Sequence, residues 1–274
     1  MNTQDLMDSA LKLAGLTEMP EDCEITVPGE NIKRVLMGVD MDTPELLLAK
    51  QLGYDCVVSH HPRNTGDNDN KLGLFLHAHI AKLEALGVPA NRTQKRIEER
   101  REELSYAFNV ANSRRSESAA KLLNMPFISM HTPADMISEV TVQKHLDAKF
   151  AGKSLVKLQE VVEALEEISE YKNSARKPII RVGSKESYAG KIYVLMAGLT
   201  GPGPDILKEY FEAGVGTLVL MHIPEKDAKA VKEQKIGNVV IAGHMPSDSV
   251  GLNKIAQKWR ESGIEVTIMS GIVE

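Results

Sequence analysis

Residues 35–62 read VLMGVDMDTPELLLAKQLGYDCVVSHHP, and this stretch decides the fold class. Residues 35–39 are an apolar run that predicts a buried strand. Asp42-Thr43-Pro44-Glu45 predicts a helix start, because it offers a capping residue, an early proline and an acidic first turn. We expect Gly53 to end this helix and residues 56–58 to form the next strand. A strand, a helix and a second strand in this order indicate a β-α-β unit and therefore a parallel sheet.

A second β-α-β unit is predicted within residues 191–224. Its strands are expected at 192–197 and 217–220, with a helix at 205–213 between them. When Gly53 is aligned with Gly214, His61 falls on His222, which indicates an internal duplication. The fold class predicted for the chain is α/β, a two-lobed β-α-β sandwich with mostly parallel sheets. We expect a first lobe from residues 1–137 and 238–274 and a second from residues 138–237. Further helices are predicted at 3–14, 72–86, 93–123, 141–170 and 247–260, and further strands at 127–130, 179–182, 239–242 and 265–269.

The composition excludes several classes of protein. The chain has 274 residues, a net charge of −5 and two cysteines without a CxxC motif. A disulfide framework or a thiolate zinc site is therefore not expected. The slightly acidic balance argues against a general nucleic-acid surface. The N-terminal residues lack the basic and apolar regions of a signal peptide, and no apolar run is as long as a membrane span. We expect a cytoplasmic protein without a membrane partner.

The main functional signal is a His-x-Pro motif that occurs four times, at His60, His131, His222 and His244. The chain has eight histidines, and these motifs contain five of them, because the first motif includes His61 as well. Each motif follows an apolar strand, and open α/β sheets bind ligands beyond the carboxyl ends of their strands. Proline keeps the preceding residue out of the helical region, so the chain leaves each strand in an extended conformation.

Two of these histidines are followed four residues later by a carboxylate. The pairs are His131 with Asp135 and His244 with Asp248, and on a helix this spacing places both side chains on one face. Imidazole and carboxylate ligands suit zinc, manganese, iron, cobalt or nickel. A single catalytic zinc ion takes three protein ligands. Six candidate ligands therefore fit two divalent metal ions better. The alternatives are structural: a strand-end histidine can be a polar terminator, and Asp248 can be a helix cap.

Two further residues are candidates for the chemical step. Asp40 follows the strand at 35–39, where it could orient a ligand or accept a proton. His222 lacks a carboxylate at the same spacing, since Lys226 stands there. Its candidate roles are orientation of a ligand or protonation of a leaving group as a general acid.

Three blocks of the sequence resemble the Nif-three-like family, which also carries the name GTP cyclohydrolase 1 type 2. The first block runs from Gly38-Val39-Asp40 through Gly53-Tyr54-Asp55 to Ser59-His60-His61-Pro62. The second is the pair His131 and Asp135, and the third is Gly243-His244 followed by Asp248. The blocks occur in the family's order, and the resemblance covers most of the chain.

The resemblance implies a two-lobed α/β protein with a dinuclear metal site between the lobes, assembled into a ring-shaped homo-oligomer such as a hexamer. The ligands it implies are His60, His61, His131, Asp135, His244 and Asp248. The sequence departs from the family pattern in three places. Asp248 replaces the usual glutamate, residues 136–139 replace a Gly-Gly-x-Asn segment, and residues 220–222 replace Thr-Gly-Glu.

Two hypotheses of function follow. The first is a dinuclear-metal hydrolase, similar to a cyclohydrolase or a phosphoesterase, that acts on a small nucleotide-like substrate. The second is a metal-binding regulatory or interaction protein that turns over no substrate. An open coordination position beside a pocket favours the first, and a closed ligand shell favours the second.

Overall fold

The computed structural model describes residues 1–62, 74–109, 112, 114–198 and 201–274. The chain divides into two compact units. Unit 1 comprises Met1–Leu72, Ser105–Ile137 and Asp248–Val273, and unit 2 comprises Gly73–Leu104, Ser138–Ser247 and Glu274. This division differs from the predicted lobes, because it assigns residues 73–104 and 238–247 to unit 2. Leu76, Leu83 and Ile97 join the hydrophobic core of unit 2, which accounts for the first of these segments.

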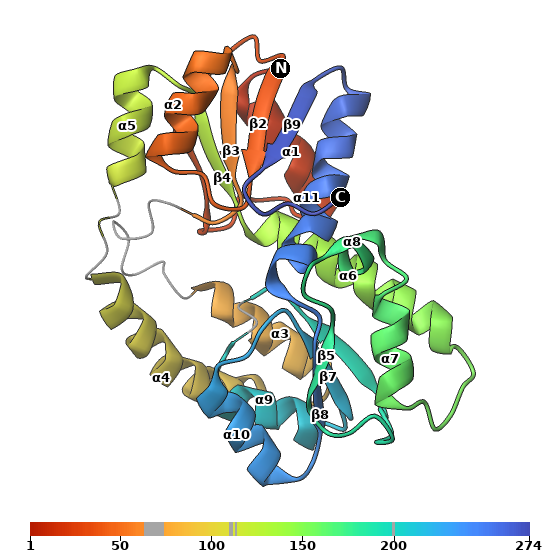
Figure 1. Ribbon diagram of the computed structural model, residues 1–274. Coiled ribbons are helices and arrows are strands. Elements are labelled where there is room, and N and C mark those ends of the chain that lie inside the picture. Colours follow the sequence, from red (N-terminus) through yellow and green to blue (C-terminus); the bar gives the residue numbers. More distant parts are fainter. Residues whose placement is uncertain (63–73, 110–111, 113, 199–200) are drawn as a thin grey trace. The chain divides into compact units, whose positions relative to one another are not determined.

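Unit 1 contains a five-stranded sheet in the order β1-β4-β3-β2-β9 (Figure 1). The strands are β1 (Cys23–Val27), β2 (Arg34–Gly38), β3 (Cys56–Ser59), β4 (Phe127–Met130) and β9 (Glu265–Met269). β1 is antiparallel to β4, and the other neighbours are parallel. The helices are α1 (Thr3–Ala14), α2 (Thr43–Leu52), α5 (Arg115–Leu123) and the unit 1 parts of α4 (Ala90–Asn109), α6 (Thr132–Phe150) and α11 (His244–Glu261). The carboxyl ends of the parallel strands therefore meet at one edge of the sheet.

The helix α2 forms for the reasons that the sequence predicts. Asp42 and Glu45 make a reciprocal capping box, and Pro44 lies in the first turn. Gly53 ends the helix in the left-handed conformation, with φ of 74°. Leu46 on α2 packs with Leu36 and Phe127 of the sheet in a continuous hydrophobic core. This packing fixes the β2-α2-β3 segment and thereby the residues that directly follow β2 and β3.

Unit 2 contains a four-stranded sheet in the order β5-β8-β7-β6. Its strands are β5 (Ile179–Val182), β6 (Ile192–Leu195), β7 (Thr217–Leu220) and β8 (Asn238–Ile241). Its helices are η2 (Leu74–His77), α3 (Ala78–Glu84), α7 (Leu158–Leu165), α8 (Ser169–Asn173), α9 (Pro204–Glu212) and α10 (Glu225–Gln234), with parts of α4, α6 and α11. β8 pairs with β5 and β7, so residues 238–241 belong to this sheet.

The two sheets share a pattern of four strands, to which the unit 1 sheet adds β9 beside β2. In each, an antiparallel edge strand is followed by three parallel strands in reverse chain order. Each edge pair also has a register shift, between Ile25 and Val27 in unit 1 and between Ile180 and Val182 in unit 2. The predicted α/β class with mostly parallel sheets is confirmed. The shared topology is what the predicted duplication requires, and the duplication itself stays a prediction.

The predicted elements were wrong in several details. The helix α10 was not predicted, and the described part of the helix expected at 72–86 consists of η2 and α3. The helix expected at 93–123 is two helices, because α5 starts afresh at Arg115 and packs against α2. The helix expected at 141–170 is three helices, with Gly152 in the left-handed region at φ of 70° between the first two. β1 was missed, although its sequence CEITV alternates apolar and polar residues, which is the pattern of a half-buried strand.

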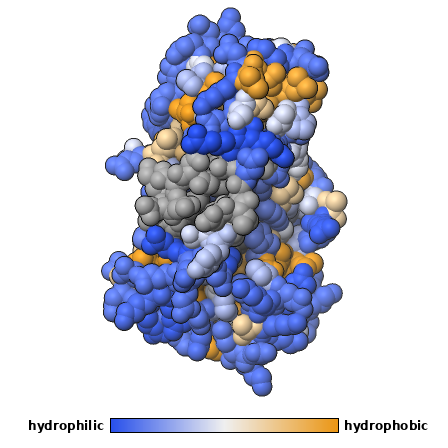
Figure 2. Space-filling view, turned by 90° about the vertical axis from the view of Figure 1, so that its left-hand side faces the viewer, coloured by the Kyte–Doolittle hydropathy of each residue, from blue (hydrophilic) through white to orange (hydrophobic). Residues whose placement is uncertain are grey.

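No helix in the described part of the chain is long and apolar enough to cross a membrane. Hydrophilic side chains cover most of the described surface on the face shown in Figure 2, between smaller hydrophobic patches.

Candidate metal centre

The strand ends of unit 1 carry the predicted histidines. His60 and His61 follow β3, and His131 follows β4. The sheet ladder continues one step past β3, since the amide of His60 donates to the Gly38 carbonyl and that of His61 to the Val39 carbonyl, both at 2.9 Å. The backbone of both histidines is therefore fixed before any ligand binds. The ring centroid of His60 lies 5.0 Å from that of His61 and 4.7 Å from that of His131.

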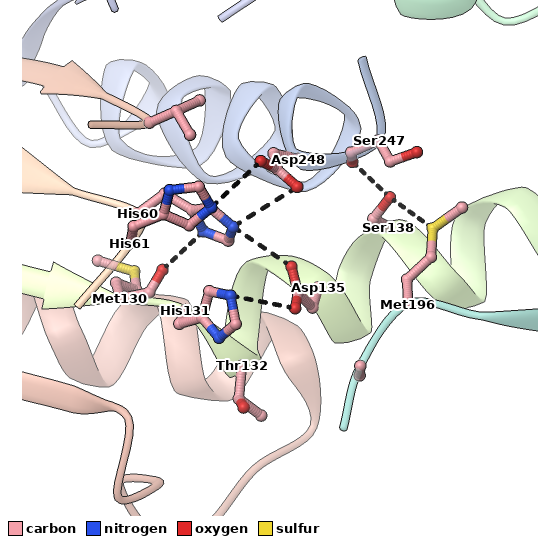
Figure 3. A network of polar contacts seen from close by, with 12 residues as sticks. His60, His61, Met130, His131, Thr132, Asp135, Ser138, Met196, Ser247 and Asp248 are labelled. Carbon is pink, nitrogen blue, oxygen red and sulfur yellow. Dashed lines mark hydrogen bonds and ion pairs between the residues drawn. The ribbon is translucent and has the colours of Figure 1, made fainter. Parts of the chain in front are cut away.

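Two carboxylates reach the histidines from helices (Figure 3). Asp135 lies in the first turn of α6, and Asp248 lies on α11. The two helices cross closely at Gly251, where an added Cβ atom would lie 2.0 Å from the carbonyl oxygen of Ala134. Only glycine allows this approach. The crossing brings the turn that carries Asp135 beside the turn that carries Asp248.

The ligand atoms converge at distances that exclude good hydrogen bonds. His60 Nε2 lies 3.4 Å from Asp135 Oδ1 and 3.6 Å from Asp248 Oδ1. His61 Nε2 lies 3.7 Å from Asp248 Oδ2, and His131 Nε2 lies 3.6 Å from Asp135 Oδ2. Hydrogen bonds between such atoms are about 2.7–3.2 Å long. Two ligand atoms that each lie about 2.0–2.2 Å from one tetrahedral ion are instead about 3.3–3.6 Å apart.

The other ring nitrogen of each histidine is held by an acceptor. Nδ1 of His60 lies 3.2 Å from the Met130 carbonyl oxygen. Nδ1 of His61 lies 3.0 Å from Asp40 Oδ1, and Nδ1 of His131 lies 2.8 Å from Asp22 Oδ2. Carbonyl and carboxylate oxygens only accept hydrogen bonds, so each Nδ1 carries a proton, and in the neutral form of each ring Nε2 presents a lone pair. This arrangement is typical of histidines that ligate metals.

The centre combines burial with negative charge. The side chains of His60 and Asp248 are 0% exposed, and that of Asp135 is 3% exposed. His60 Nε2 and Asp135 Oδ1 make no hydrogen bond to any residue in the described ranges. Buried polar atoms without partners are costly, and buried carboxylates need a compensating cation. The residues therefore fit a divalent metal ion, and two clusters made only of unit 1 residues could hold one: His60, His61 and His131, and His60, Asp135 and Asp248.

The pKa values of the histidines respond to the same charges. Burial alone would lower the pKa of His60, but the adjacent carboxylates of Asp248 and Asp135 outweigh it and raise that pKa well above its usual value. The pKa of His61 falls to about 4, because burial and the charge of His60 both oppose a second positive charge. The site thus attracts a positive charge at His60.

The structural alternative for Asp248 is wrong. α11 begins at His244, so Asp248 lies a full turn inside the helix and does not cap it. His244 lies one turn before Asp248 and belongs to unit 2. Oδ1 of Asp40 lies 3.0 Å from Nδ1 of His61, and the Asp40 side chain is 52% exposed. The role of Asp40 in the chemical step stays a prediction.

His222 lies at the end of β7 in unit 2. Its ring meets the ring of His244 edge to face, with centroids 4.9 Å apart. It belongs to none of the potential ligand clusters found among the described residues. Its place beside His244 agrees with the strand-end position that the sequence predicts, and its role stays a prediction.

Asp22 is the site residue that the sequence reading missed. It directly precedes β1, and Cys23 of β1 pairs with Met130 of β4, so Asp22 lies opposite His131. Recognition of the short strand Cys23–Val27 and its antiparallel pairing would have revealed it. Burial raises the pKa of Asp22, but the hydrogen bond and charge of His131 outweigh burial and hold that pKa below its usual value. Asp22 is therefore a buried, ionised carboxylate.

Comparison with solved structures shows the family of this chain. It is 32% identical to a NIF3 superfamily protein from Sphaerobacter thermophilus, with a TM-score of 0.92 over 99% of this chain and 98% of that one. The chain belongs to the NIF3 superfamily. Reduced HcgD from Methanocaldococcus jannaschii is 15% identical, with a TM-score of 0.59 over 98% of this chain and 97% of that one. TTHA1606 from Thermus thermophilus is 14% identical, with a TM-score of 0.55 and 98% of each chain covered. These two share the fold. No family model and no curated protein sequence matches the chain.

Proposed function

We propose that this protein is a metal-dependent hydrolase that binds two divalent transition metal ions and acts on a small nucleotide-like substrate. The observation that carries the proposal is the set of three histidines whose Nε2 atoms face two buried carboxylates, while every Nδ1 is already bonded to the protein. Histidines with a purely structural role have no need to aim three Nε2 atoms into a buried acidic centre. The nucleotide-like substrate rests on the resemblance of the sequence blocks to the cyclohydrolase family.

The proposed ligands are His60, His61, His131, Asp135, His244 and Asp248. The first three supply imidazole nitrogens from the strand ends of unit 1. Asp135 and Asp248 supply negative charge, and Asp248 shares one face of α11 with His244, four residues earlier. Mixed nitrogen and oxygen ligands suit zinc, manganese, iron, cobalt or nickel. When bound, such ions polarise carbonyl or phosphoryl oxygens and lower the pKa of water.

Other residues of the chain would orient the ligands and transfer protons. Asp40 accepts from His61 Nδ1 and so orients that ring, and its exposed carboxylate is a candidate proton acceptor. His222, against the ring of His244, is the candidate general acid. The rigid strand ends hold the histidines in place before a substrate arrives, which reduces the reorganisation needed for reaction.

The test begins with metal content. Protein purified without chelator is reloaded separately with zinc, manganese, iron(II), cobalt and nickel, and elemental analysis measures the ions per chain. We expect about two ions per chain. The Asp135→Asn variant removes the charge of one proposed ligand and should hold less metal. Absence of bound transition metal after reloading contradicts the proposal.

A screen of nucleoside triphosphates and phosphoesters with the loaded protein then tests turnover. Hydrolysis that depends on the added metal and falls in the Asp135→Asn variant supports the hydrolase. Full metal content without turnover of any compound in the screen favours the second hypothesis, a metal-binding regulatory or interaction protein.

A further inference from the structure

Asp22 lies at the carboxyl edge of the unit 1 sheet, although it does not follow one of the parallel strands. Residues that follow β2, β3 and β4 reach this edge because those strands run parallel. Asp22 reaches it because β1 runs the other way and begins there, with Cys23 opposite Met130. The antiparallel edge strand therefore places a carboxylate directly opposite the residue that follows β4, which is His131.

The hydrogen bonds of Asp22 tie it to His131 and to its neighbours. Oδ2 accepts from His131 Nδ1 at 2.8 Å and from the Thr132 hydroxyl at 2.7 Å. Oδ1 accepts from the Cys23 thiol at 3.6 Å. The side chain of Asp22 is 4% exposed. Burying a carboxylate costs free energy unless a nearby group compensates its charge. The backbone pairing of β1 with β4 does not itself require a charged side chain at this position.

The other two histidines have different acceptors at Nδ1. His60 Nδ1 faces a neutral carbonyl oxygen, and His61 Nδ1 faces Asp40, whose side chain is 52% exposed. Solvent weakens the influence of an exposed carboxylate, whereas a buried one acts in a low dielectric. Unit 2 repeats the strand order, but the residue before its antiparallel edge strand is Pro178, which offers no carboxylate.

We infer that Asp22 is a positioning residue of the metal centre: it fixes His131 as the Nδ1-protonated tautomer, aims Nε2 at Asp135 and strengthens His131 as a metal ligand. This inference rests on the proposed metal site. Partners of this kind orient ligand histidines and increase their basicity, and their loss lowers metal affinity about 10–100-fold.

The experiment measures metal affinity by competition with a chromogenic chelator in Asp22→Ala, Asp22→Asn and wild-type protein, with zinc as the probe. We expect Asp22→Ala to bind zinc about 10–100-fold more weakly. Asn keeps an acceptor oxygen without the charge, so Asp22→Asn should show a smaller loss in the same direction. The visible absorption of the cobalt(II)-loaded proteins, which reports ligand geometry, should change in the same order.

Asp55 provides the matched control. Its carboxylate accepts from the backbone amides of Lys33 and Arg34 at 2.9 and 2.8 Å, away from the metal centre. Asp55→Asn should lower the urea midpoint and leave zinc affinity and the cobalt spectrum unchanged. A merely structural role for Asp22 predicts the same behaviour for both sites.

The inference is overturned if Asp22→Asn, or a folded Asp22→Ala, binds zinc as tightly as wild type with an unchanged cobalt spectrum. If Asp22→Ala does not fold, the Asn variant decides the question. Failure of the proposed function has a different signature. If the wild-type protein does not bind zinc, the proposed metal site is wrong. If the wild-type protein binds zinc but turns over no substrate, the role of Asp22 still holds.

Discussion

At the scale of single residues, the metal centre is defined by how each side chain is held. Nδ1 of His60, His61 and His131 is bonded to the protein, so the direction of Nε2 is set before a ligand arrives. Asp135 and Asp248 face these atoms from inside two helices. The chemistry of the site therefore depends on both the histidines and the acceptors behind them.

Asp248 gives the most direct test at this scale. Asp248→Asn removes a negative charge from a buried centre while it keeps the size of the side chain. Metal affinity should fall by more than the roughly 10–100-fold that is typical when a metal ligand loses its hydrogen-bond partner. The metal-free variant should be at least as stable as metal-free wild type, because one buried charge disappears. Chelator competition and urea unfolding of the metal-free proteins measure the two effects.

Asp147 on α6 is the control for this substitution, since it is an exposed carboxylate whose hydrogen bond joins it to Gln143. Asp147→Asn should leave both measurements unchanged. Equal metal affinity in Asp248→Asn and wild type would show that Asp248 is not a ligand.

At the scale of elements, the crossing of α6 and α11 sets the distance between the two carboxylates. Gly251→Ala would place a Cβ atom 2.0 Å from the Ala134 carbonyl oxygen, which backbone cannot tolerate. We expect the helices to separate, with a loss of about 1–3 kcal/mol of stability. Metal occupancy should fall as well, because Asp135 and Asp248 move apart. Urea unfolding and elemental analysis measure both changes.

Lys254→Ala on the exposed side of α11 is the control for this crossing. It changes a side chain on the same helix without entering the contact, so both quantities should stay near wild type. A Gly251→Ala variant with full stability and full occupancy would refute the argument.

The contact between α2 and α5 predicts a dependence on pH. Asp42 caps α2 and also accepts from Arg115 and Ser116 of α5. Burial raises its pKa, but these hydrogen bonds outweigh burial and lower it from 3.8 to about 2. The unfolded chain therefore binds this proton more readily than the folded one. The stabilisation is fully present above a pH of about 4–5 and is lost as the pH falls towards 2.

Asp42→Asn keeps a capping oxygen but loses the charge, so it isolates this contribution. The difference in urea midpoint between wild type and Asp42→Asn should be largest near neutral pH and should shrink as the pH falls below about 4. A difference that stays constant from neutral pH down to a pH of about 3 would contradict the role of the Asp42 carboxylate.

At the scale of the whole molecule, metal binding should stabilise unit 1. Its sheet, α6 and α11 all supply proposed ligands, so bound ions tie these elements together. An ion present at about 100 times its Kd adds about 2.7 kcal/mol. For a chain of this size, that corresponds to a rise in Tm of about 5–10 °C.

Calorimetry with and without chelator measures this shift, and hydrogen exchange locates it. We expect slower exchange at the ends of β3 and β4 and in α6 and α11 next to the ligands when metal is bound. The Asp248→Asn variant should show little response to chelator. Equal Tm values for the loaded and metal-free wild-type proteins would argue against a metal centre that joins these elements.

Much of the local structure could be predicted from the sequence. Residues 3–14 form α1 as expected, and Asp42, Pro44 and Gly53 mark the limits of α2 as expected. The histidines at the ends of β3 and β4 were recognised because strand ends and His-x-Pro motifs are local patterns. The predicted ligands His60, His61, His131, Asp135 and Asp248 all lie in unit 1, and five residues thus meet in one centre.

The sequence by itself determined the α/β class, most element limits and the types of ligand, because periodicity, caps and strand ends are encoded by neighbouring residues. The tertiary structure alone decided which side chains hydrogen-bond to the proposed ligands and which of those ligands lie close together. Asp22 and His131 are 109 positions apart, and they meet because β1 pairs antiparallel to β4. Asp135 and Asp248 approach each other because Gly251 lets α6 and α11 cross closely. Strand pairing and helix crossing depend on packing between distant segments, and no local pattern in the chain specifies them.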